Sequence, residues 1–132
     1  MIYFETKKSY ISVLMKRFLK SVGHALNGWR LFFTKEKNGQ IQTTVAILVL
    51  ITAFALKLNL YEWIMILVCM ALVLALEMVN SVIEKLVDHL HPGKHDNIKW
   101  VKDVAAGAVL WAAVISAVIG GIIFVPKLLA LL

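Results

Sequence analysis

The chain has 132 residues, of which 61% are hydrophobic, and a mean hydropathy of +0.82. This length allows one domain, and a soluble domain of this size cannot bury so much apolar surface, so the composition favours a membrane protein. The net charge is +6, but no base-stacking platform or groove-reading motif accompanies it, so we expect no nucleic-acid partner. The single cysteine, Cys69, excludes an intramolecular disulfide and a cysteine-based zinc site.

Residues 8–35 predict an amphipathic helix that lies at the membrane surface. Apolar residues recur three and four positions apart, and Lys16, Lys20 and Arg30 fall largely on other faces. Eight of the fourteen lysines and arginines precede residue 38, which is typical of attraction to anionic lipid headgroups. A solvated helix packed on a partner is the alternative for this segment. The recurring apolar positions are Ile11, Leu14, Phe18, Val22, Ala25 and Trp29.

Three later segments are long and apolar enough to cross a bilayer, and we expect transmembrane helices at residues 38–57, 62–90 and 98–127. In the third segment, Ala112, Ser116 and Gly120 form a stripe of small residues, which allows close helix packing in lipid. The expected fold is therefore a single all-α membrane domain over residues 1–132, with a surface helix followed by three membrane helices.

The distribution of lysine and arginine predicts that the N-terminus lies on the cytoplasmic side of the cell membrane. With that orientation, twelve of these residues lie on the cytoplasmic side, and only Lys57 and Lys127 lie on the other. Positive charge is retained on the cytoplasmic side of membrane proteins, so the bias is decisive.

Polar residues interrupt the end of the second apolar segment at Glu77, Asn80, Glu84 and Asp88. Their spacings of 3, 4 and 4 residues place them on one helix face within about 80°. An isolated carboxylate in apolar surroundings is costly, so Glu77 must face protein, a metal or water, and it is suited to accept a proton from a hydroxyl. Glu84 lies nearer the cytoplasm and is suited to bind Mg²⁺ together with phosphate oxygens.

Lys102 and Asp103 open the third predicted membrane helix, where the lysine can neutralise the charge of a transferring phosphate and the aspartate can fix the lysine. A structural role is the alternative for the acidic face, because such residues also pair between helices. For Asp88, solvation or a lysine partner is favoured over catalysis. The histidines at 89, 91 and 95 lack the spacing of a metal-ligand pair, and the absence of a GxxxxGK[ST] sequence excludes a P-loop kinase.

The segment from Glu77 to Asp88, EMVNSVIEKLVD, strongly resembles the signature of the prokaryotic diacylglycerol kinase/undecaprenol kinase family, E-x-x-N-[ST]-x-I-E-x-x-x-D. Lys102-Asp103 follows at the expected separation, and the resemblance extends from about Arg17 to the end of the third predicted span. It implies a small membrane lipid kinase that works as a homotrimer with composite active sites between protomers. The implied reaction transfers the γ-phosphate of ATP to the hydroxyl of a membrane lipid alcohol, with Mg²⁺ as cofactor.

The same resemblance implies roles for individual residues. Glu77 would be the general base, with Asn80 and Arg30 also contacting the lipid substrate, and Glu36 and Glu84 would hold Mg²⁺ on ATP. One departure from the family is the turn after the surface helix, where Asn-Glu followed by Phe-Arg is usual and Lys35-Glu36-Lys37-Asn38 stands here. The residues implied to contact the nucleotide are Arg17, His24, Glu36, Glu84, Lys94, His95, Lys102 and Asp103.

Three segments, Glu62-Trp63, residues 72–77 and residues 102–110, resemble the undecaprenol kinase branch, which favours undecaprenol as the substrate. A diacylglycerol kinase that makes phosphatidic acid is the alternative. From another class, a non-catalytic membrane assembly protein or a proton-coupled carrier also accounts for a buried glutamate. A transport path needs polar residues through the full membrane depth, and the outer halves of the predicted spans have almost none.

Overall fold

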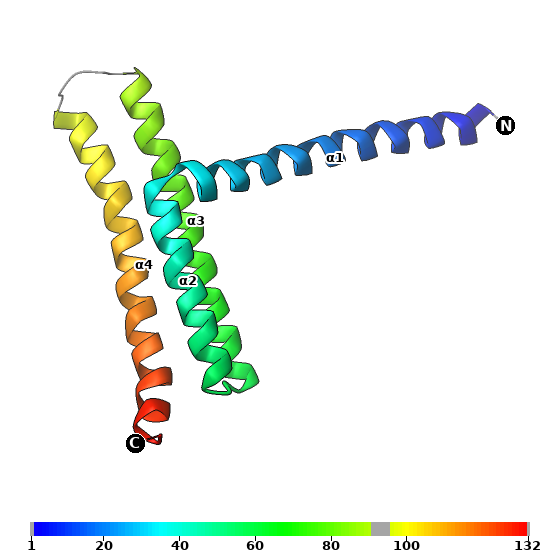
Figure 1. Cartoon of the computed structure of the whole chain (residues 1–132). Helices are drawn as coiled ribbons and strands as arrows, with labels where there is room; N and C mark the ends of the chain where they lie inside the picture. Colours follow the sequence, from blue (N-terminus) through cyan, green and yellow to red (C-terminus); the bar gives the residue numbers. More distant parts are fainter. Residues whose placement is uncertain (1, 91–95, 132) are drawn as a thin grey trace.

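The structure is a computed structural model that describes residues 2–90 and 96–131, with side chains described from Ile11 onward. The described chain is all-helical, as predicted, and its helices are α1 (Ile2–Lys35), α2 (Lys37–Ala55), α3 (Leu60–Leu90) and α4 (Asp96–Leu129). On length and composition, α2, α3 and α4 can each cross a membrane, which confirms the three expected spans. These helices run side by side, whereas α1 runs crosswise to the bundle and its N-terminal end lies far from it (Figure 1).

The bundle helices differ in length, so the polar end of α3 and the start of α4 reach beyond the first residues of α2. The 19 residues of α2 span about 28 Å, close to the hydrocarbon thickness of about 30 Å. The 31 residues of α3 span about 46 Å. The end of α3 and the start of α4 therefore extend past the corner between α1 and α2 (Figure 1).

The corner between α1 and α2 is a single extended residue, Glu36, with φ −92° and ψ 123°. The Gln40 backbone N–H donates to the Glu36 carbonyl at 3.0 Å, and the Gln40 side-chain amide donates to the Thr34 carbonyl at 3.0 Å. Phe32 is buried against Gly39, where a Cβ atom would lie 2.7 Å from the Phe32 carbonyl oxygen. Only glycine fits there, so this contact fixes the direction in which α1 leaves α2.

At the opposite end of the bundle, the α2–α3 connection forms a Schellman turn. Lys57 has φ 50°, its N–H donates to the Phe54 carbonyl at 3.2 Å, and the Leu58 N–H donates to the Ala53 carbonyl at 3.2 Å. A lysine in the left-handed region costs about 1 kcal/mol relative to glycine. The turn is held by packing, because Ala53 and Leu58 are buried together with Ile66.

The start of α3 is joined to the end of α4 by one glutamate. Asn59 Oδ1 accepts from the Glu62 N–H at 3.0 Å, and Glu62 Oε2 accepts from the Asn59 N–H at 2.7 Å, which is a reciprocal capping box. The same Glu62 oxygen lies 3.1 Å from Lys127 Nζ. We call Asn59, Glu62 and Lys127 the outer clasp.

The most extensive helix pair is α3 with α4. Val109 and Ala112 are buried on α4, opposite a set on α3 that includes polar side chains. Many large apolar side chains are exposed elsewhere, including Phe54 at 73% and Trp111 at 71%. In a membrane, such side chains face lipid or a neighbouring protein. The buried residues of α3 are Ile66, Val73, Glu77, Asn80 and Ser81.

Candidate active site

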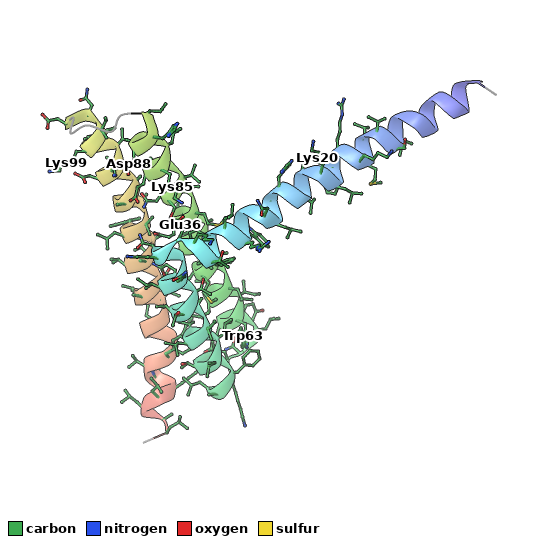
Figure 2. All side chains as sticks on the ribbon, turned by 45° about the horizontal axis from the view of Figure 1, so that its top comes forward. Lys20, Glu36, Trp63, Lys85, Asp88 and Lys99 are labelled. Atoms are coloured by element: carbon green, nitrogen blue, oxygen red, sulfur yellow. The ribbon has the colours of Figure 1, made fainter. Side chains whose placement is uncertain are left out.

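The polar face of α3 changes from buried to exposed along the helix. Glu77 and Asn80 are each only 4% exposed, Glu84 is partly exposed, and Asp88 is exposed. The helix period places all four on one face, as the spacing predicts. The exposed end, with Asp88, lies past the α1–α2 corner, where Glu36 and Lys85 are also labelled (Figure 2).

Two buried oxygen atoms on this face have no partner in the part of the chain that the structure describes. Among the described residues, Glu77 Oε1 and Asn80 Oδ1 accept no hydrogen bond. Asn80 uses its amide instead, and Nδ2 donates to Glu84 Oε1 at 3.0 Å. A buried polar atom without a partner costs free energy, more so for a carboxylate, so the site is complete only when another group reaches these oxygens. A substrate hydroxyl or a second chain supplies a group of this kind.

Glu36 connects the α1–α2 corner to α3. It stands at the N-cap position of α2 but makes no side-chain cap. Its carboxylate Oε1 is paired instead with Nζ of Lys85, the residue after Glu84. This ion pair brings Glu36 to the residue next to Glu84, the other predicted metal ligand, which lies 48 residues away in the sequence. It also fixes how far Glu77 lies from the corner along α3. Glu77 precedes Lys85 by eight residues, which is about 12 Å toward the middle of the bundle.

Lys102 connects α4 to the same end of α3. Its Nζ lies 2.9 Å and 3.1 Å from the two carboxylate oxygens of Asp88. Asp88 is therefore the lysine partner that the sequence favours over a catalytic residue. Asp103 is exposed beside Lys102. The two ion pairs, Glu36–Lys85 and Asp88–Lys102, both lie beyond Glu84 toward the C-terminal end of α3, because Lys85 and Asp88 follow it by one and four residues.

Within one chain, α1 carries the predicted contacts Arg17 and His24 away from this face. Arg17, His24 and Arg30 are exposed on α1, which runs away from the bundle (Figures 1 and 2). Arg17 lies 19 residues before Glu36, or about 28 Å along the helix axis. The remaining predicted nucleotide contacts, Lys94 and His95, lie outside the described residues.

The described residues contain no group of three or more histidine, cysteine and acidic side chains that could hold a metal ion. Mg²⁺ in phosphoryl transfer does not need such a group, because phosphate oxygens and water complete its shell around one or two carboxylates. Glu36, at the α1–α2 corner, and Glu84, on α3, are both partly exposed and offer oxygen ligands. Their chemistry fits Mg²⁺ bound with a nucleotide.

A cavity of about 450 Å³ lies between α2, α3 and α4. Its wall reaches Val73 and Leu74, one turn on the membrane side of Glu77, and Gln42 on α2. Two residues of the small-residue stripe, Ser116 and Gly120, also line it. In a single chain, part of this stripe therefore faces open volume rather than a packed helix.

Sequence reasoning missed Lys85 and the outer clasp. A lysine directly after Glu84 carries no signal of its partner, because that partner lies on a different helix. The Asn59-x-x-Glu62 spacing before an apolar run is a capping-box pattern and gives the signal for one half of the clasp. Lys127 has no comparable signal.

The described chain is thus an all-helical bundle of membrane length with a buried carboxylate and a charged end, the features of an integral membrane protein with a polar site. The model of the family described as prokaryotic diacylglycerol kinase matches residues 23–124. The chain belongs to this family. It is a membrane lipid kinase, which uses ATP and a lipid alcohol.

Two characterised proteins are similar to this chain over most of its length. An undecaprenol kinase of Bacillus subtilis (strain 168) is 42% identical over 115 residues, which cover 86% of this chain and 93% of that protein. A diacylglycerol kinase of Synechocystis sp. (strain ATCC 27184 / PCC 6803 / Kazusa) is 34% identical over 116 residues, which cover 86% of this chain and 66% of that protein.

Proposed function

We propose that this lipid kinase phosphorylates undecaprenol and that Glu77 is the general base. The observation that carries the proposal is the buried Glu77 Oε1, which has no partner among the described residues. A carboxylate kept at 4% exposure without a cation is costly, and a lipid hydroxyl that donates to it removes that cost. Family membership favours this role over the assembly-protein and carrier alternatives.

In the proposed reaction, Glu77 takes the proton of the lipid hydroxyl while the hydroxyl oxygen forms a bond to the γ-phosphorus of ATP. The bond from that phosphorus to the bridging oxygen breaks, and ADP leaves. Asn80, equally buried on the same face, would donate a hydrogen bond from Nδ2 to the oxygen of the hydroxyl, whose single proton goes to Glu77. When bound, Mg²⁺ held by Glu36 and Glu84 neutralises charge on the phosphates.

Lys102, Asp103 and the α1 residues would complete the nucleotide site. The Lys102 side chain is 35% exposed, so its ammonium can leave Asp88 and pair with a phosphate of the nucleotide. Arg17 and His24 lie too far along α1 to reach the acids of their own bundle, so we propose that they serve a neighbouring protomer in a homotrimer. The unpartnered oxygens of Glu77 and Asn80 support the same arrangement, because a second chain would also cover them.

We further propose that α1 lies at the cytoplasmic surface of the cell membrane. Large apolar side chains such as Phe18 at 63% and Trp29 at 55% are exposed on α1 together with Lys16 and Lys20. A helix with this mixture suits the headgroup region. The end of the bundle beside the α1–α2 corner carries Lys85, Lys99 and Lys102, which supports a cytoplasmic location for that end.

Undecaprenol is favoured over diacylglycerol by two observations. The undecaprenol kinase is the more similar of the two relatives, at 42% against 34% identity. Glu77 also lies about 12 Å on the membrane side of Lys85, below the charged end. An alcohol that carries one hydroxyl on a hydrocarbon chain reaches that depth at less cost than one whose ester groups must also leave the headgroup region.

The test is transfer of phosphate from labelled ATP by the purified full chain in mixed micelles, with undecaprenol and diacylglycerol offered side by side. We expect undecaprenol to give the higher kcat/KM by at least about tenfold, or about 1.4 kcal/mol of transition-state binding. A preference for diacylglycerol would replace the substrate with its alternative, and no transfer to either lipid would reject the proposal.

A further inference from the structure

Lys85 occupies an unusual place in the site. It follows Glu84 directly, yet its ammonium is paired across to Oε1 of Glu36 on the α1–α2 corner. The lysine side chain is 68% exposed, whereas the glutamate side chain is 23% exposed. The carboxylate is therefore held in place between helices, while the cation bound to it stands in water.

We propose that Lys85 is a stand-in cation for Glu36: it occupies the carboxylate in the metal-free protein and is displaced when a divalent cation binds. The inference rests on the proposed function in one respect, which is that Glu36 is a metal ligand. It assigns to Lys85 a positioning role rather than a catalytic one.

The physical reason is competition for one oxygen. An ammonium and a divalent cation at the same carboxylate repel each other, so each weakens the binding of the other. Because Lys85 is mostly in water, its ion pair with Glu36 is weak and exchanges easily. In the meantime the pair keeps the α1–α2 corner against α3, so that Glu36 remains beside the position of Glu84. Lys85 thus lowers the affinity of Glu36 for a divalent cation, while it keeps Glu36 in the position where the cation binds.

The test measures binding of Mn²⁺, as a divalent probe, to the full chain in bicelles without nucleotide. Lys85→Gln should tighten Mn²⁺ binding by about three- to tenfold, the range expected when one nearby charge is removed in a partly aqueous site. Lys85→Arg keeps the charge and should stay within about twofold of the parent. Lys99→Gln is the matched control, because it removes the same charge from the same end of the bundle (Figure 2), and it should also stay within about twofold.

A double-mutant cycle with Glu36→Gln shows whether Lys85 acts through Glu36. If it does, Lys85→Gln has no effect on Mn²⁺ affinity once Glu36 is neutral. An equal gain in both backgrounds, or no gain in the parent, would overturn the inference about Lys85. A failure of the proposed metal site gives a different result, because Glu36→Gln alone would then leave the Mn²⁺ affinity unchanged. In that case both Glu36 as a metal ligand and Lys85 as its stand-in cation would be rejected.

Discussion

At the scale of single residues, the polar face of α3 is arranged by depth. Its deepest members, Glu77 and Asn80, are buried, and each has an oxygen without a partner among the described residues. Its outermost member, Asp88, is exposed and paired with Lys102. A purely structural set of polar residues would be expected to pair its buried members first, because those cost the most when unpaired. The reverse order indicates that the buried end is kept for a group from outside the chain.

The proposed metal ligands give a prediction at this scale. Glu36→Gln and Glu84→Gln should each raise the Mg²⁺ concentration needed for half-maximal kinase activity by about tenfold or more, because each removes one carboxylate from the ion. The measurement is a Mg²⁺ titration at fixed, saturating ATP. Glu62→Gln removes a carboxylate at the other end of α3 and should leave the requirement unchanged. An unchanged requirement in both of the first two variants would reject this ligand pair.

At the scale of helices, both corners of α2 depend on close packing rather than on favourable local sequence. Gly39 admits the carbonyl and ring of Phe32, and Lys57 adopts the left-handed conformation to let Leu58 bury against Ala53. These corners decide where α1 leaves the bundle and how α2 pairs with α3. They therefore also decide where Glu36 stands relative to Lys85.

The corner at Gly39 is tested by a pair of glycine substitutions. Gly39→Ala places a Cβ 2.7 Å from the Phe32 carbonyl oxygen, and the required shift should lower the free energy of unfolding by about 1–3 kcal/mol. Gly28→Ala is the control, since its Cβ would meet nothing within 4 Å, and it should stabilise the helix by up to about 1 kcal/mol. Unfolding in a detergent titration measures both. Equal behaviour of the two variants would show that Phe32 does not pack on Gly39.

The outer clasp separates into two contributions. Glu62→Gln keeps an oxygen for the Asn59 N–H and loses the ion pair with Lys127, so the free energy of unfolding should fall by about 1 kcal/mol or less. Glu62→Ala also loses the capping box and should cost about 1 kcal/mol more. The same detergent titration distinguishes the two. If glutamine and alanine prove equally destabilising, the capping box contributes nothing.

The membrane helices and the acidic face could be predicted from the sequence because both are local patterns. Apolar length identifies a span, and spacings of three and four place Glu77 to Asp88 on one face. The contacts that organise the site are not local: Glu36–Lys85 and Asp88–Lys102 join separate segments of the chain, and each depends on how the helices are aligned. Lys57 adopts a conformation that glycine or asparagine usually marks, so its turn left no signal. The roles of all the predicted site residues, from Arg17 on α1 to Asp103 on α4, stay predictions.

At the scale of the whole molecule, a single chain leaves a cavity open between its membrane helices and holds α1 away from the bundle. The cavity between α2, α3 and α4 is open, and α1 extends about 51 Å over its 34 residues. That length is enough to cross a neighbouring bundle, since a helix with its side chains is about 10 Å wide. A homotrimer with shared sites accounts for both features.

Shared sites predict complementation between inactive chains. Arg17→Ala chains and Glu77→Gln chains should each be nearly inactive alone. Co-expressed in equal amounts and mixed at random, they should recover about a quarter of the parental turnover, because that share of sites draws both intact residues from different chains. Turnover of the purified mixture is the measurement. Recovery no greater than the sum of the two separate preparations would place both residues in one protomer.

The central claim is that Glu77 is the base, and turnover of Glu77→Gln, measured with the oligomeric state of the same sample, tests it most directly. Glutamine keeps the shape of the side chain and its hydrogen bonds but loses the basicity. General base catalysis typically contributes about 10²–10⁴-fold, so turnover should fall by that factor in an assembly of unchanged size. Turnover within a few-fold of the parent in an intact assembly would contradict the account, because Glu77 would then be a structural residue that a neutral amide replaces.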